Sequence, residues 1–164
     1  CILGALVLAG PACITQVDFV MAQDMPTHHI KKLAILPFAS PDAGVEMDMT
    51  NAFAVEFLRI GCVVVDRSEL DRLLKEQELS QTGLVDPSMA VQIGRLAGAD
   101  AIIIGNGRGA KGDHLGRAFA KIIDVKTSSI LAVATLVEGE RMTAAEFAVA
   151  AVQPIQGKIC SKQE

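Results

Sequence analysis

Apolar and polar residues recur with two different periods along residues 62–105. The short, β-branched run at 62–65 is typical of a strand that is buried on both faces. Apolar positions then recur at helical spacing over 68–78 and again over 87–97, with charged residues between them. A second apolar run follows at 101–104. The pattern predicts a strand, two amphipathic helices and another strand in close succession.

Capping residues mark the ends of these two helices. Ser68, with Asp71 three residues later, is predicted to cap the first helix. Asp86 suits the N-cap of the second helix, and Pro87 suits its first turn. Gly98 is a typical residue just beyond a helix C-terminus. These signals support two separate helices.

The rest of the chain adds strands and helices on both sides of this stretch. Periodicity predicts strands at 33–38, 115–125 and 129–137, and helices at 46–59 and 143–152. The order β-α-β-α-α-β-β-β-α predicts an α/β fold of the α+β type. We expect a mixed sheet flanked by helices, in two or three layers.

Several sequence motifs of this chain resemble, in the same order, those of one protein family. They are the run 66–77, which begins Asp-Arg-Ser, the pair Ser80 and Gly83, and the run 94–105, which contains Gly-Ala-Asp. The strands 33–38 and 120–127 match as well, with Ser128 in place of the usual glycine. Over residues 31–153 the chain resembles the CsgG-like family of bacterial envelope lipoproteins, which includes the curli assembly/transport component CsgG and LpoB-type relatives.

The resemblance implies a binding role in the bacterial envelope. It implies a non-enzymatic periplasmic scaffold or accessory protein of envelope assembly or secretion, which binds an envelope protein or associates with itself. The pore-forming member has two membrane-spanning hairpin insertions, at places where this chain has only 105–117 and 136–143. Each membrane-crossing strand needs ~9–11 residues. A hairpin needs two such strands and a turn, and neither segment is long enough, so we expect no transmembrane hairpins. A ring-forming subunit of a curli-type outer-membrane secretion complex is the alternative.

The N-terminus reads as a targeting segment. Residues 1–10 are apolar. This run is too short for a membrane-spanning helix of ~20 residues but suits the apolar region of a signal peptide. Cys13 follows small residues and is predicted to be lipidated. Cleavage without lipidation and lipidation of Cys1 are the alternatives. All three predict export, and a lipidated cysteine implies anchoring at the inner leaflet of the outer membrane.

These observations divide the chain into four parts. We expect a signal-peptide remnant or lipid-anchor region at 1–13, a linker at 14–30, the CsgG-like domain at 31–153 and a C-terminal tail at 154–164. Within them, Cys62 is expected to be a small core residue, and Cys160 to be exposed in the tail. A Cys13–Cys160 disulfide is an alternative that lipidation of Cys13 would exclude.

Composition argues against a nucleic-acid partner. The formal net charge is −4, and the basic residues are scattered along the sequence. The chain has no Trp, no Tyr and six Phe, so it lacks the aromatic platforms on which single-stranded nucleic acids stack.

A glycine-rich segment is the main candidate for a cofactor site. Residues 107–112 match the pattern GxGxxG, which binds a dinucleotide where it opens a helix, so a nucleotide-binding enzyme is the remote alternative. Residues 113–118 instead continue into a strand, so we predict a hairpin loop and no cofactor. The basic residues of this loop form a candidate interaction site: Arg108, Lys111 and His114.

The other polar residues do not form a convincing chemical site. His28 and His29 are adjacent in the expected linker and lack the spacing that converges metal ligands. Ser68 has no histidine nearby in the sequence to activate it, and a capping role explains it better. Asp66 and Arg67 are expected to form a structural ion pair. We therefore predict neither catalytic residues nor a metal site.

Overall fold

The computed structural model describes residues 17–23, 30–77, 86–110, 112–137 and 141–160. The predictions for Cys1, Cys13, His28, His29 and Lys111 lie outside these residues.

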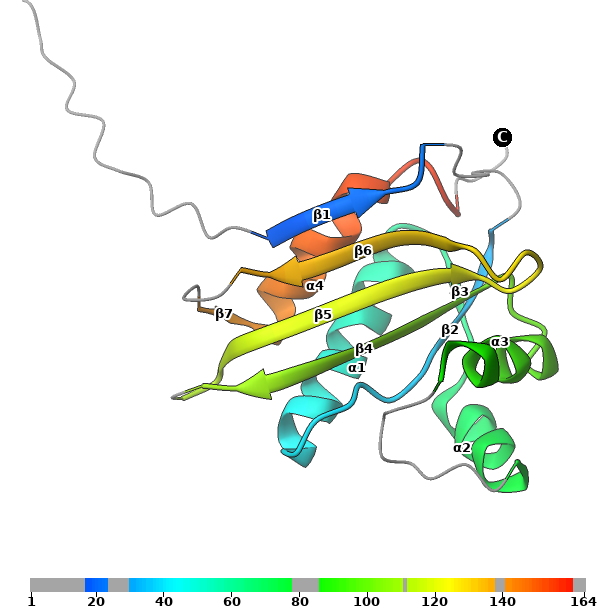
Figure 1. The fold of residues 1–164 in the computed structure, drawn as a ribbon, viewed down its shortest axis with the longest axis horizontal. Coiled ribbons are helices and arrows are strands. Elements are labelled where there is room, and N and C mark those ends of the chain that lie inside the picture. The colour runs from blue at the N-terminus through cyan, green and yellow to red at the C-terminus, as the bar shows by residue number, and fades with distance from the viewer. Residues whose placement is uncertain (1–16, 24–29, 78–85, 111, 138–140, 161–164) are drawn as a thin grey trace, which may run out of the picture.

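Among the described residues, seven strands form one mixed sheet in the order β1-β6-β5-β4-β2-β3, and β7 pairs with β5 (Figure 1). The strands are β1 (Val17–Met21), β2 (Lys32–Ile35), β3 (Val63–Val64), β4 (Ala101–Gly109), β5 (His114–Asp124), β6 (Ile130–Leu136) and β7 (Met142–Thr143). The helices are α1 (Ala43–Arg59), α2 (Arg67–Glu76), α3 (Pro87–Leu96), α4 (Ala144–Val152) and the short 3-10 helix η1 (Gln153–Ile155). Strand β2 runs parallel to β3 and β4, and the other pairs are antiparallel. The predicted mixed sheet flanked by helices is confirmed.

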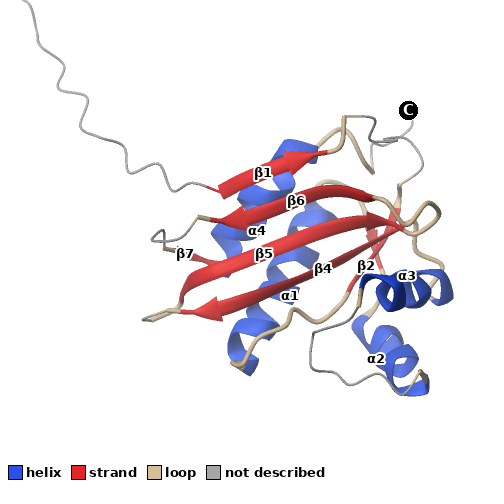
Figure 2. Cartoon of the chain, in the orientation of Figure 1, coloured by secondary structure: helices blue, strands red, loops and turns tan. Residues whose placement is uncertain are grey.

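The helices cover the two faces of the sheet unequally. Helices α1 and α4 lie against one face along its length, whereas α2 and α3 cover only one end of the other face (Figures 1 and 2). The main core lies under α1 and α4. There the ring of Phe53 lies 4.9 Å from that of Phe38 and 5.8 Å from that of Phe147, measured between centroids. None of the helices in the described residues therefore lies over the rest of the second face.

The two predicted helices 68–78 and 87–97 are confirmed as α2 and α3. In α2 the apolar stripe Leu70, Leu73 and Leu74 is buried against the sheet. In α3 the side chain of Asp86 accepts a hydrogen bond from the amide of Ser88, and Pro87 stands in the first turn. The cap predicted for α2 is wrong in one respect, because Asp66 and not Ser68 is the N-cap residue.

The helix caps should make folding sensitive to acid. Hydrogen bonds from the hydroxyl and the amide of Ser68 lower the pKa of Asp66, and Ser88 lowers the pKa of Asp86 in the same way. A carboxylate whose pKa is lower in the folded state stabilises the fold above its unfolded pKa, and this contribution is lost as the pH falls through the folded-state pKa. We expect a variant with Asp66→Asn and Asp86→Asn to lose less unfolding free energy than the wild type between neutral and strongly acidic pH, as measured by urea unfolding. Asparagine caps a helix without titrating, so an equal loss in both proteins would contradict this role.

The predicted linker at 14–30 is wrong over residues 17–21, which form β1. This strand pairs antiparallel with β6, with Val17 opposite Leu136 and Met21 opposite Ala132. Its alternate residues Val17, Phe19 and Met21 pack against the main core, which explains why so short a segment joins the sheet.

The C-terminal tail predicted at 154–164 is also wrong over most of its described part. The side chains of Ile155 and Ile159 are fully buried in the main core. Cys160 is buried as well, and it forms a disulfide with Cys62, with 4.9 Å between the two Cα atoms. The expectation of an exposed Cys160, and the alternative of a Cys13–Cys160 bridge, are thereby overturned. The bridge fastens the end of the chain beside β3.

Strand β4 is longer than predicted. The sequence predicts a strand at 101–104, whereas β4 extends to Gly109 and pairs with β5 along its whole length. The extension carries Gly105, Gly107 and Gly109, residues that normally weaken a strand. It also brings Arg108 into the sheet.

Candidate protein-binding face

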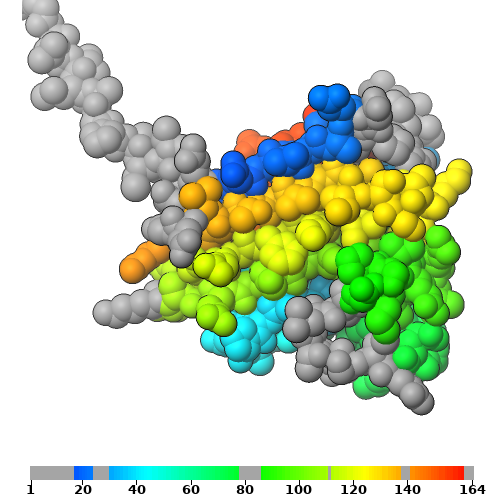
Figure 3. Space-filling view, in the orientation of Figure 1, coloured from blue at the N-terminus to red at the C-terminus, as the bar shows by residue number. Residues whose placement is uncertain are grey.

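The part of the second face of the sheet that α2 and α3 leave uncovered forms one continuous surface, here called the open face. It lies across the front of the molecule, with α3 at one end (Figure 3). Its residues come from β1, β6, β5 and β4: Asp18, Val20, Val133, Thr135, Arg117, Phe119, Lys121, Ile104, Asn106 and Arg108. The alternate residues on the other side of these strands pack into the main core.

Strand register aligns these side chains in rows across the sheet. In one row Lys121 stands between Ile104 on β4 and Val133 on β6, and Val20 on β1 continues the row. A second row runs through Asn106, Phe119, Thr135 and Asp18 in the same way. The Nζ atom of Lys121 lies 5.3 Å from the centroid of the Phe119 ring, within the range of a cation–π contact. The face is thus a regular surface of mixed apolar and basic character.

Positive charge gathers on the open face although the chain as a whole is acidic. The face holds three cations, Arg108, Arg117 and Lys121, and one carboxylate, Asp18. Arg108 stands directly opposite Arg117 in the β4–β5 ladder. Both side chains are exposed, so this end of the face offers positive charge and hydrogen-bond donors. It suits an acidic binding partner.

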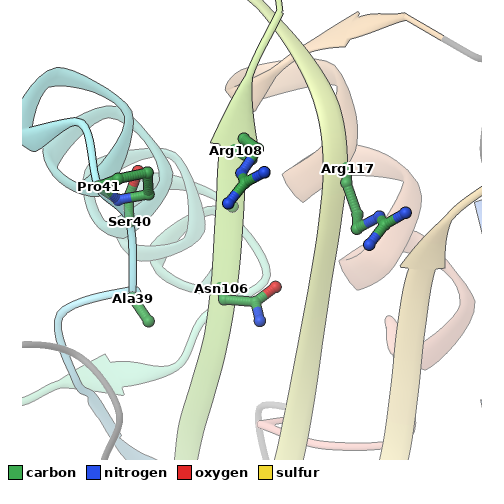
Figure 4. Close-up of a pocket in the computed structure, with 7 residues that line it drawn as sticks. Ala39, Ser40, Pro41, Asn106, Arg108 and Arg117 are labelled. Atoms are coloured by element: carbon green, nitrogen blue, oxygen red, sulfur yellow. The ribbon is translucent and has the colours of Figure 1, made fainter.

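A hollow of about 420 Å³ lies at the arginine end of the open face. Figure 4 shows Arg108 and Arg117 extending from neighbouring strands along the same surface, with Asn106 on β4 and the segment 39–41 beside them. The described residues that line it include no carboxylate, histidine or cysteine, so they supply no general base. The chemistry of this hollow is that of hydrogen-bond donors and positive charge.

A second hollow, of about 580 Å³, lies at the other end of the face, between α3 and the β5–β6 hairpin. Its lining combines apolar residues such as Val91, Ile123 and Ile130 with the polar side chains of Gln92 and Arg95. Ile130 is 50% exposed. The open face therefore continues into a partly apolar groove between α3 and the β5–β6 hairpin.

The glycine-rich segment 107–112 does not open a helix. The predicted hairpin is present as β4 followed by β5, but the loop predicted at 107–112 is wrong over residues 107–109, because Gly107 and Gly109 belong to β4. The glycines of β4 face α1. A Cβ atom on Gly105 would overlap the carbonyl oxygen of Phe119 and the ring of Phe38, and one on Gly107 would overlap the sulfur of Met49. Close packing against Phe38 and β5 accounts for Gly105, and close packing against Met49 of α1 accounts for Gly107.

The predicted interaction residues Arg108 and His114 have different surroundings. Arg108 lies on the open face, whereas Nδ1 of His114 lies 3.0 Å from Oδ1 of Asp113, and His114 pairs with Thr143 of β7. Sequence reasoning missed Arg117 and Lys121. Their spacing with Phe119, at every second residue of a predicted strand, is the signal that could have placed all three on one face.

The polar residues of the α2 region have structural partners. The hydroxyl and the amide of Ser68 both donate to the carboxylate of Asp66. The expected Asp66–Arg67 ion pair is wrong, because Arg67 lies 3.4 Å from a carboxylate oxygen of Glu46 and 4.0 Å from one of Asp71. Exposed pairs of this kind contribute little stability.

Two negative findings apply to the described part of the chain alone. None of its helices combines the length and the apolar character needed to cross a membrane. Nor does it gather three or more His, Cys, Asp or Glu side chains in a position to hold a metal ion.

Comparisons with known proteins now complete the description. A family model described as "Curli production assembly/transport component CsgG" matches residues 35–106. This match confirms the predicted resemblance to the CsgG-like family. The matched segment begins at the last residue of β2 and contains α1, β3, α2, α3 and β4 as far as Asn106. In the comparison with curated proteins, none matched the chain significantly.

Several solved structures are similar to this chain in fold at low sequence identity. The C-terminal domain of LpoB from Salmonella enterica has a TM-score of 0.53 at 15% identity, and the alignment covers 69% of this chain and 82% of that one. A PelC dodecamer from Paraburkholderia phytofirmans has a TM-score of 0.56 at 14% identity, with 86% and 97% covered. An NMR structure of LpoB from E. coli has a TM-score of 0.53 at 15% identity, with 71% and 59% covered. At these identities the similarity shows the fold.

Proposed function

We propose that this protein is an exported, non-enzymatic scaffold or accessory protein of the bacterial envelope, anchored by a lipidated Cys13 to the inner leaflet of the outer membrane. The observation that carries the proposal is the CsgG family match over residues 35–106, which include α3 and the first six residues of β4 at the border of the open face. The matching family is described by its part in curli production, assembly and transport. This chain would act in an envelope assembly or secretion system by binding another protein.

The Cys62–Cys160 disulfide supports export. The two cysteines are 98 residues apart and both are buried, so the bond belongs to the packed core. Structural disulfides form and persist in oxidising compartments such as the bacterial periplasm and are rare in the cytosol.

The surroundings of the polar residues support a binding role without catalysis. Asp124 is fully buried, and its carboxylate accepts a hydrogen bond of 2.7 Å from the amide of Thr127 in the β5–β6 turn. Thr143 and Glu146 cap α4 reciprocally, and this contact lowers the pKa of Glu146. These groups hold turns and helix ends, whereas Arg108 and Arg117 stand at exposed positions of the open face, where another protein can contact them.

Lipid anchoring can be tested on the full-length precursor by metabolic labelling with radioactive palmitate, followed by cell fractionation. We expect label in the wild type and in Cys1→Ala, and loss of label together with release from the outer membrane in Cys13→Ala. The control is Cys1→Ala, because it removes the alternative cysteine from the same segment. Label that persists in Cys13→Ala and disappears in Cys1→Ala would move the anchor to Cys1. Absence of label from all three proteins would refute lipid anchoring.

A further inference from the structure

Strand β1 forms one edge of the sheet. In the described part of the chain it pairs with β6 alone, and it lies along the upper border of the sheet, where the open face ends (Figures 1 and 3). The opposite edge, β3, has only two residues, and Cys62 just before it is joined to Cys160. Strand β1 is therefore the longer of the two edges. The N–H and C=O groups along an edge strand can pair with another chain.

The hydrogen-bonding pattern shows which backbone groups of β1 point outward. In an antiparallel pair, every second residue exchanges hydrogen bonds with the residue opposite it. The amide of Ala22 donates to the carbonyl oxygen of Leu131 on the β6 side at 2.8 Å, and by the same alternation Val20 bonds to β6. Phe19 and Met21 alternate with these residues. Their N–H and C=O groups therefore point away from β6, toward the outside of the sheet.

The side chains of β1 are less covered than those of the strand beside it. Val17, Phe19 and Met21 pack against the main core but are only half-buried, whereas the residues opposite them on β6 are buried. On the other side of the strand Val20 is 69% exposed. Edge strands are commonly protected by lysine, proline or a bulge, and β1 has none of these, its one charge being that of Asp18. A further strand beside β1 would complete the burial of its core side.

We propose that β1 binds an extended segment of a partner protein, which adds a strand to the sheet. The outward N–H groups of Phe19 and Met21 would donate to carbonyl oxygens of the segment, and their C=O groups would accept from its amides. Residues of the segment that lie beside Phe19 and Met21 on the core side would be apolar. A lysine or arginine opposite Asp18 would form a cross-strand ion pair. This inference rests on the proposed scaffold function and specifies the surface and the kind of segment it binds.

Selection of short random peptides, displayed on phage, against the oxidised full-length protein in detergent tests the inference. We expect the selected peptides to alternate apolar and polar residues, and the strongest is then labelled for fluorescence anisotropy. Val20→Lys should weaken its binding at least about tenfold, because a charged residue on an edge strand opposes pairing. The matched control is Val63→Lys. Val63 is a valine of similar exposure, 58%, on the opposite edge, so this variant should bind as the wild type does.

Hydrogen exchange at single amides, measured by NMR, gives the decisive result. With the peptide bound, the amides of Phe19 and Met21 should exchange at least about tenfold more slowly, because each gains a backbone hydrogen bond. The amide of Val20 already bonds to β6 and should change less. On the peptide, N-methylation of one alternate set of residues should abolish binding, and methylation of the other set should not. A contact made only by side chains cannot produce this alternation.

Several outcomes would overturn the inference. They are a selection that yields no peptide, binding that survives Val20→Lys, or unchanged exchange at Phe19 and Met21. A protein that dimerises alone, and loses the dimer in Val20→Lys, would assign the edge to a second copy instead. Circular dichroism checks folding. If Val20→Lys unfolds, Val17→Pro replaces it, because proline is tolerated at the first residue of a strand and removes an outward amide.

Failure of this inference can be told apart from failure of the proposed function. A lipidated, outer-membrane protein that selects no peptide would refute only the inference. A protein that binds strand-forming peptides through β1 but carries no lipid would refute only the anchoring in the proposed function.

Discussion

Removal of the Cys62–Cys160 disulfide is expected to lower the free energy of unfolding by roughly 4–5 kcal/mol. The bond closes a loop with a sequence separation of 98 residues, and a loop of this size restricts the unfolded chain by about that amount. For a chain of 164 residues this corresponds to a fall of about 10–20 °C in the melting temperature. No change of similar size is expected from a single surface substitution.

Loss of the disulfide should destabilise the C-terminal segment, residues 155–160, more than the rest of the fold. The amide of Cys160 donates to the carbonyl oxygen of Ile30 at 2.9 Å, and Ile155 and Ile159 are buried beside it. Without the bond these contacts alone hold the C-terminal segment against the core. We expect faster hydrogen exchange at residues 155–160 after reduction, before exchange rises in β4 and β5.

Urea unfolding with and without reductant gives the difference in unfolding free energy and so tests the prediction. The double variant Cys62→Ala/Cys160→Ala is the control, because its unfolding midpoint should be low and insensitive to reductant. Equal midpoints for the oxidised and the reduced wild type would contradict the prediction. They would also weaken the case for export, because a disulfide that does not stabilise the fold is poor evidence that the protein works in an oxidising compartment.

The elements that could be predicted from the sequence are those whose signals are local. Helices α2 and α3 carry apolar stripes and capping residues within a few positions of one another, so periodicity found both. The hairpin of β5 and β6 was predicted for the same reason, and the positive φ of Ser128 shows the tight turn that joins these strands. Local patterns therefore predicted the middle of the fold.

Elements that depend on distant partners were missed. Strand β1 has only five residues, and its place in the sheet is decided by β6, more than one hundred positions later. The partner of Cys160 is likewise far away in the sequence, and nothing near either cysteine specifies it. The polar residues of the C-terminal segment made it look like a solvated tail, although Ile155 and Ile159 are buried.

The candidate binding face could be predicted only in part. Arg108 was recognised as a basic residue, but its loop was expected to be separate from the sheet. The extension of β4 could not be predicted from the sequence, because the glycines at 105, 107 and 109 have low strand propensity. Without that extension, the pairing of Arg108 with Arg117 could not be foreseen. Here glycine reflects the contacts of β4 with Phe38 and with α1, which no local pattern reveals.

Substitution of Gly105 by alanine is expected to destabilise the fold by about 3 kcal/mol. A Cβ atom at this position would overlap the carbonyl oxygen of Phe119 on the neighbouring strand and the ring of Phe38. The backbone oxygen cannot move without disturbing the β4–β5 ladder, and Phe38 is fully buried. Overpacking of a tight core costs this much because neighbouring groups must leave their preferred positions. Urea unfolding of the oxidised protein gives the change.

The matched control is Gly109→Ala, on the same strand and facing the same helix. There the added Cβ atom would lie 3.3 Å from Cγ2 of Val45, a contact that a partly exposed side chain can relieve. We expect a change of less than about 1 kcal/mol, since alanine also restricts the unfolded chain more than glycine does. Equal effects of the two substitutions would show that glycine is required throughout the segment for its backbone flexibility. A large effect confined to Gly105 would establish that close packing between α1, Phe38 and β4 determines this part of the sequence.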